Sequence, residues 1–242
     1  MGPDNKFQLN TAQMNSSQAR AADMDVGLRQ YMLRVYNYMT LGLGLTGGVA
    51  FAASTSPELM QMIHGTPLRW VVMLAPLGFV MFLSARLHAV KPATAQMLFW
   101  VYAGLMGLSL SYIFLAFTGA SISRVFFITA ATFAGMSLYG YTTKRDLSGF
   151  GSFLFMGLIG IIIASVVNIF LASSALHFVI SVVGVLVFVG LTAYDTQAIK
   201  SVYSETDSGA TQEKKAIMGA LRLYLDFINL FVMLLSLFGN RN

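Results

Sequence analysis

The sequence predicts an all-α membrane protein with seven transmembrane helices. Of its 242 residues, 56% are hydrophobic and only 10% are charged, whereas soluble domains carry about 25% charged residues. The apolar residues also gather in long runs that prolines, glycines and charges separate. Because a hydrocarbon core of about 30 Å needs about 20 apolar residues per helix, the chain has room for seven spans joined by short loops.

Seven apolar runs mark the expected spans, and each is interpreted as one helix because a lipid-facing backbone must satisfy its hydrogen bonds internally. The runs are Leu33–Ala53, Trp70–Ala85, Ala95–Thr118, Val125–Tyr141, Phe153–Leu171, Phe178–Ala193 and Ile217–Phe238. None of the loops between them is long enough to form another domain. We therefore expect a polar, mobile N-terminal tail over residues 1–30 and a seven-helix membrane domain over residues 31–242.

The lysines and arginines predict the orientation of the chain, because cytoplasmic loops keep an excess of positive charge. With alternating spans, most of the fifteen Lys and Arg residues share the side of the N-terminal tail: Lys6, Arg20, Arg29, Arg34, Arg86, Lys91, Lys144, Arg145, Lys200, Lys214 and Lys215. The opposite side has Arg69, Arg124 and Arg241, and Arg222 lies inside the last run. The N-terminus is therefore predicted to be cytoplasmic and the C-terminus to lie on the far side.

The composition excludes several classes of function. The chain has no cysteine, which excludes disulfides, thiolate metal sites and cysteine nucleophiles. The net charge of +5 is scattered over the ends of spans, as membrane topology requires, so no nucleic-acid partner is expected. The three histidines lack the spacing of metal ligands. We expect neither an enzyme nor a bound cofactor.

Two acidic residues lie within the expected spans, where ionisable groups are costly and usually functional. Asp195 lies at the end of the sixth span, two residues after its apolar run, and Asp226 lies in the seventh. Along the seventh run, Arg222, Asp226 and Asn229 follow helical spacing and share one polar face. Two interpretations stay open: this face belongs to a functional site, or Arg222 and Asp226 neutralise each other within one helix.

The two aspartates are predicted to lie in the same half of the membrane. Asp195 is about 15 Å from the centre of its run at Val185, and Asp226 is about 6 Å from the centre of the seventh run at Leu230. Both residues are displaced toward the cytoplasmic side. The sequence therefore allows a contact between Asp195 and Asp226 but does not establish it. In contact, two carboxyl groups in a low dielectric cannot both ionise cheaply, so one keeps a proton and the pair senses pH. When ionised, the pair offers oxygen ligands suited to Ca²⁺.

Two aspartates on late spans are also typical of intramembrane aspartyl proteases. The Tyr194–Asp195 dipeptide fits the first motif of such enzymes, but Leu223, Tyr224 and Leu225 precede Asp226 where a Gly-x-Gly motif is needed. No proline follows Pro92, so the later Pro-Ala-Leu motif is absent as well. Because a motif counts only in its context, the sequence does not support proteolysis.

Three segments carry a family resemblance. Residues 127–149 read FITAATFAGMSLYGYTTKRDLSG, and the two aspartates lie in Gly190–Lys200 and Leu223–Phe231. These segments resemble the fourth-span motif and the two aspartate segments of the Bax inhibitor-1, or transmembrane Bax inhibitor motif, family. The resemblance extends from about Arg29 to the C-terminus. It implies a fold in which six helices surround a central, hydrophobic seventh.

The resemblance also implies a calcium leak with a paired-aspartate pH sensor near the cytoplasmic mouth. Asp195 and Asp226 match that pair and are the tentative calcium ligands. In the family an arginine late in the second span latches onto the first aspartate, and Arg86 is the positional candidate. The residues alone leave Arg86 as either that latch or an anchor reaching the interface. Arg222 departs from the family pattern, because that position is usually uncharged in the family, and its positive charge would repel a cation.

The leading hypothesis is therefore a pH-sensitive calcium leak channel gated by Asp195 and Asp226. The alternative is a non-transporting regulator that binds or modulates a membrane protease or a stress-response partner, as some bacterial relatives do through their cytoplasmic tails. The expected partners are the lipid bilayer, calcium, protons and a membrane protease. Short loops and a plain tail favour a bacterial inner membrane.

Overall fold

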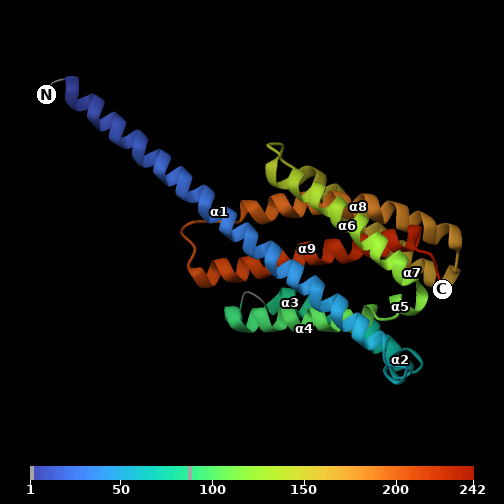
Figure 1. The fold of residues 1–242 in the computed structure, drawn as a ribbon. Helices are drawn as coiled ribbons and strands as arrows, with labels where there is room; N and C mark the ends of the chain where they lie inside the picture. The colour runs from blue at the N-terminus through green and yellow to red at the C-terminus, as the bar shows by residue number, and fades with distance from the viewer. Residues whose placement is uncertain (1–2, 87–88) are drawn as a thin grey trace.

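The computed structural model describes the backbone of residues 3–86 and 89–242, and the side chains of residues 26–83, 85–86 and 89–242. Within these ranges the regular elements are helices, with one isolated bridge between Phe117 and Arg241. The helices are α1 (Pro3–Ser54), α2 (Pro57–His64), α3 (Leu68–Arg86), α4 (Pro92–Leu110), α5 (Ile113–Ala116), α6 (Gly119–Thr142), α7 (Ser148–Leu171), α8 (Ser174–Ser201) and α9 (Gly209–Phe238). The predicted all-α class is confirmed (Figure 1).

Five of the described helical segments are long and apolar enough to cross a membrane. They are α6, α7, α8, α9 and the segment Pro92–Ala116, which joins α4 to α5. Helices α2 and α3 supply a sixth span if they count as one, although the chain bends by 80° between them. The prediction of a membrane protein with several spanning helices is thus confirmed, with five or six candidate spans.

The first expected span, Leu33–Ala53, is helical but falls outside these candidates. Four glycines and Thr46 lie between Gly42 and Gly48, which makes this part of α1 less apolar than the other spans. The helix has 52 residues, so at 1.5 Å per residue it is about 78 Å long, more than twice the hydrocarbon thickness of about 30 Å. The expected boundary between tail and membrane domain, at residue 30, therefore lies inside one continuous helix.

Short polar caps set where several helices begin. Ser56, Thr118, Ser173 and Ser208 each accept a hydrogen bond through the side-chain oxygen from the backbone N–H three residues later, at 3.3 Å in every case. Such caps satisfy one of the N–H groups that a helix start leaves unpaired. They let the chain enter α2, α6, α8 and α9 directly from short loops.

Helix α9 lies at the centre of the bundle and packs against α1, α4, α6 and α8 (Figure 1). Of its most apolar 18-residue stretch, 56% is buried, against 11% in α7, which packs mainly on α8. A hydroxyl of α9 also bonds to α1: Tyr224 donates to Thr46 Oγ1 at 2.6 Å, and Thr46 donates to the carbonyl of Ala103 in α4 at 2.8 Å. A buried α9 fixes the depth of its polar residues within the bundle.

Helices α6 and α8 approach each other closely at Gly140. A Cβ at Gly140 would overlap the backbone carbonyl of Ala193 in α8, whereas a Cβ at Gly135, on the same helix, would meet open space. We expect Gly140→Ala to destabilise the protein by about 1–3 kcal/mol through overpacking, and Gly135→Ala to leave its stability unchanged. Thermal unfolding of both variants in detergent would measure this difference, and equal melting temperatures would contradict a close approach of α6 to α8 at Gly140.

Candidate functional site

The structure brings Asp195 of α8 and Asp226 of α9 together. Both are buried, with exposed fractions of 7% and 4%, and their carboxyl groups lie close enough to interact with each other. A hydrogen bond between two carboxyl groups needs a proton on one of them, because ionised carboxylates only accept. Because two ionised carboxylates would repel each other in a low dielectric, we expect the pair to hold one proton and one negative charge. The depth argument from the sequence allowed this contact, and the packing of α8 on α9 makes it.

Arg222 supplies the neighbouring positive charge. Its Nη1 lies 3.9 Å from Oδ1 of Asp195, so the ion pair joins α9 to α8. The arginine side chain remains 52% exposed. With one proton on the two carboxyl groups, as expected, Arg222 would balance the one negative charge that remains. The sequence left open whether Arg222 pairs only within its own helix, and the structure sets it against the aspartate of the neighbouring helix.

Arg86, the other candidate partner, is located differently. It ends α3 and is exposed, and its side chain forms no ion pair with the residues that the structure describes. Its role as a latch on Asp195 stays a prediction. Between the two candidates, Arg222 is the arginine that the structure positions at the pair.

A cleft of about 660 Å³ opens onto the pair between α3, α7, α8 and α9. Its wall is mainly apolar, and its polar members include Asp195, Arg222, Asp226 and Asn229. The three α9 residues expected to share a polar face therefore line one cleft. Asn229 donates its amide to the carbonyl of Leu225 at 2.8 Å, which leaves its side-chain oxygen as an acceptor. The cleft thus presents carboxyl and amide oxygens within an apolar surrounding.

One oxygen of each aspartate has no hydrogen-bond partner among the described residues: Oδ1 of Asp195 and Oδ2 of Asp226. Unpaired buried acceptors are costly and can bind a proton or a cation. The described residues contain no cluster of three or more His, Cys, Asp or Glu side chains that could hold a metal ion. Because Ca²⁺ takes six to eight oxygen ligands, the two carboxyl groups alone supply too few oxygens to hold a resident calcium ion.

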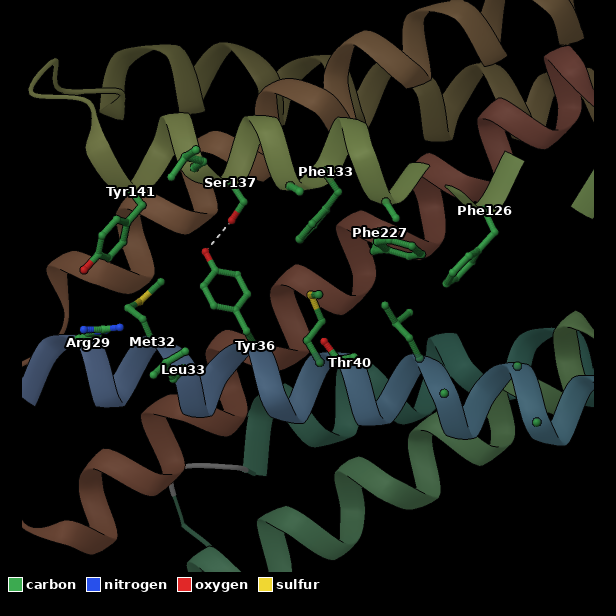
Figure 2. Close-up of a pocket in the computed structure, with 18 residues that line it drawn as sticks. Arg29, Met32, Leu33, Tyr36, Thr40, Phe126, Phe133, Ser137, Tyr141 and Phe227 are labelled. Atoms are coloured by element: carbon green, nitrogen blue, oxygen red, sulfur yellow. Dashed lines mark hydrogen bonds between the residues drawn. The ribbon is translucent and has the colours of Figure 1, made fainter. Parts of the chain in front are cut away.

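A larger groove, of about 1040 Å³, lies between α1 and α6 over α9. In Figure 2 it extends from Arg29 and Tyr141 at one end to Phe126 at the other, with Phe133 and Phe227 along its wall. Its lining is mostly apolar. This groove is separate from the aspartate cleft, which α3, α7, α8 and α9 enclose.

A series of hydrogen-bonded hydroxyl groups connects this groove to Thr196, the residue that follows Asp195. Tyr36 of α1 bonds Ser137 of α6 at 2.6 Å (Figure 2), and Ser137 bonds Thr196 of α8 at 3.0 Å. Thr196 donates to the carbonyl of Thr192 at 2.7 Å. Sequence reasoning searched the spans for charges and missed these hydroxyls, although a polar side chain in lipid also needs a partner. These hydrogen bonds hold α1, α6 and α8 in fixed positions relative to one another, next to the aspartate pair.

Comparisons with known proteins agree with this architecture. A family model described as inhibitor of apoptosis-promoting Bax1 matches residues 28–242. The chain is 51% identical over 217 residues to the uncharacterized protein RP147 of Rickettsia prowazekii, covering 90% of this chain and 92% of the relative. It is 50% identical over 218 residues to the inner membrane protein YbhL of Escherichia coli K12, covering 89% and 93%. An uncharacterized protein of Caulobacter vibrioides is 48% identical over 245 residues, covering 96% and 97%.

The shared proton can be observed directly. We expect an infrared band of a protonated carboxylic acid at neutral pH that disappears in Asp226→Asn, because Asp195 then faces Arg222 alone and is ionised. Asp146 is the matched control: hydrogen bonds from Ser148 hold the pKa of this loop carboxyl below its usual value, so it is ionised at neutral pH and Asp146→Asn should leave the band unchanged. The absence of such a band in the wild type would mean that the pair holds no proton.

Proposed function

Since the chain belongs to the family of inhibitors of apoptosis-promoting Bax1, we propose that it forms a pH-sensitive calcium leak pathway. Asp195 and Asp226 are its gate and pH sensor. The observation that carries this proposal is the buried pair of carboxyl groups beside Arg222, on the wall of a cleft that opens into the bundle. Its location is a bacterial inner membrane, because the similar protein YbhL is named an inner membrane protein.

The gate is the contact between Arg222 and Asp195. Arg222 lines the aspartate cleft and also a second cavity, of about 400 Å³, between α1, α8 and α9. In this position the arginine stands between the two cavities and presents a positive charge to any cation that would pass. As long as Asp195 shares the single negative charge of the pair, it holds Arg222 there. The pathway is then closed.

Acidification opens the gate through this charge balance. A second proton neutralises the pair, so Asp195 no longer attracts Arg222, whose half-exposed side chain is then better solvated away from the cleft. The two cavities join once the guanidinium has moved. Calcium is the cargo rather than a resident ion, and oxygens of Asp195, Asp226 and Asn229 replace part of its water as it passes.

The proposal includes a complete topology of seven spans. The glycine-containing part of α1 and the bent pair of α2 and α3 join the five apolar segments, and six spans surround α9 with the N-terminus in the cytoplasm. The contacts of α9 with α1, α4, α6 and α8 support its central place. The excess of Lys and Arg on the side of the N-terminus supports the orientation.

A non-transporting regulator is the second candidate. Its support is the length of α1, which continues well past the bundle toward the N-terminus (Figure 1). A helix that extends beyond the membrane offers a surface to a membrane protease or a stress-response partner. The segment of residues 1–30 would then carry the activity, and the aspartate pair would serve stability.

Calcium flux into dye-loaded liposomes separates the two candidates. We expect wild-type flux above that of empty vesicles and rising as the pH falls below neutral. Asp195→Asn, which cannot hold Arg222 by charge, should raise the flux at neutral pH and remove its pH dependence. Asp226→Asn should shift the pH response, because a fixed amide donor replaces the shared proton. The loop variant Asp146→Asn is the control. Wild-type flux no greater than that of empty vesicles would leave the regulator as the function.

The identity of the latch can be tested by a matched pair of variants. Removing the charge in Arg222→Gln should raise the flux at neutral pH by about fivefold, the equivalent of about 1 kcal/mol for a partly exposed ion pair. Arg86→Gln should leave the flux unchanged, because Arg86 has no ion pair with the described residues. If Arg86→Gln raised the flux and Arg222→Gln did not, the latch would be Arg86 and the assignment to Arg222 would be wrong.

A further inference from the structure

A second site lies on the other side of Arg222 from the aspartates. The cavity of about 400 Å³ is enclosed by α1, α8 and α9, near the point where α8 ends and α9 begins. Its polar lining comes from Tyr31, Ser201, Thr211, Lys214, Lys215 and Arg222, and the remaining wall is apolar. Thr211 and Arg222 are eleven residues apart on α9, which corresponds to about 16 Å. The cavity therefore extends from the start of α9 inward to the arginine.

Tyr31 is a buried tyrosine in the lining of this cavity. The residue is only 2% exposed, and its hydroxyl has no partner among the described residues. Its ring packs against that of Tyr203, with centroids 5.5 Å apart, which fixes its orientation. A buried hydroxyl without a partner is costly, so Tyr31 is a donor in need of an acceptor oxygen.

The charge of the lining is positive. Three cationic residues line the cavity, and no Asp or Glu among the described residues does so. Lys215 is paired with Asp207, which lies outside the lining, and also donates to the carbonyl of Val202 at 2.8 Å. Arg222 contributes a half-exposed guanidinium whose ion-pair contact, with Asp195, is as long as 3.9 Å. An anion entering the cavity meets these cations and a hydroxyl donor.

We propose that this cavity binds a negatively charged phosphate group, supplied by an anionic phospholipid or by a free phosphate ion. Arg222 and Tyr31 donate to its oxygens, and Lys214 faces it from the lining. Arginine and lysine are the usual ligands of phosphate, and basic pockets between helices at the cytoplasmic side of a membrane bind lipid headgroups. The apolar part of the wall accommodates the start of an acyl chain when the source is a lipid.

Binding at this site favours an open gate. A phosphate in the cavity attracts Arg222 from the side opposite Asp195, so the arginine divides its charge between the two sites. This consequence for conduction rests on the proposed function, whereas the binding itself does not. Binding of phosphate therefore offers a second way to draw Arg222 away from Asp195, in addition to protonation of the aspartates.

The binding is tested with the full-length protein by two probes. Inorganic phosphate is titrated into the protein in detergent by calorimetry, and the protein is separately reconstituted into vesicles of phosphatidylcholine with or without phosphatidylglycerol, where its melting temperature is measured. We expect saturable binding of phosphate, stabilisation by phosphatidylglycerol, or both. Stabilisation by phosphatidylglycerol without binding of the free ion would identify the lipid as the source, and the reverse would identify the ion.

Matched variants make the test specific. Tyr31→Phe keeps the ring and removes the donor, so it should weaken binding by about tenfold, as expected for a hydrogen bond to a charged group. Lys214→Gln should weaken it as well. Tyr102 is the control, because it is also a buried tyrosine whose hydroxyl lacks a partner among the described residues, but it lies outside this cavity. No binding of either probe, or equal binding by wild type, Tyr31→Phe and Lys214→Gln, would overturn the proposal.

Flux in the same vesicles distinguishes failure of the site from failure of the gate. We expect phosphatidylglycerol to raise calcium flux at neutral pH in the wild type and in Tyr102→Phe, and not in Tyr31→Phe. Binding without calcium flux under any condition would contradict the proposed leak while supporting the site. Flux that depends on pH but is the same in all variants and vesicles would contradict the link between the site and Arg222.

Discussion

The structure depends on one contact, the approach of Asp195 in α8 to Asp226 in α9. Two ionised carboxylates would repel each other in a low-dielectric interior, so we expect the pair to hold one proton, and Arg222 balances the charge that remains. Helices α8 and α9 must therefore meet at the depth where the two residues face each other. Burial of α9 among its neighbours follows from the same requirement, because a helix that carries Arg222, Asp226 and Asn229 cannot turn this face to lipid.

The sequence predicted this site because charges within apolar runs are rare and costly. Asp195 and Asp226 could be identified in this way, and their assignment to the same half of the membrane followed from counting residues along each run. Their contact could not be derived, since it depends on how α8 crosses α9. Five of the apolar runs became helices long and apolar enough to span a membrane, because runs of this length and composition have no other stable structure in lipid.

Other features of the site and the fold could not be predicted, because they depend on how the helices pack against one another, which the sequence of a single span does not show. The choice between Arg86 and Arg222 as the partner of Asp195 needed the positions of α3 and α9 relative to α8. The hydroxyl chain from Tyr36 to Thr196 joins residues from three helices, and its members look ordinary in the sequence. The bend between α2 and α3 and the great length of α1 were missed because runs of apolar residues report composition and not the direction of the helix axis.

Close packing around Asp195 indicates which part of the site can move. Gly140 of α6 leaves no room for a Cβ against Ala193, and Gly151 of α7 leaves none against the ring of Tyr194. The two residues before Asp195 are thus held from two sides, while Thr196, directly after it, is hydrogen-bonded to Ser137. A helix fixed by close contacts on both neighbours cannot shift without disrupting the bundle. Arg222, whose side chain is half exposed and faces a cavity on each side, is free of such constraints. In the proposed gate, the part that moves is therefore the arginine side chain, while the aspartates stay in place and would change only their protonation.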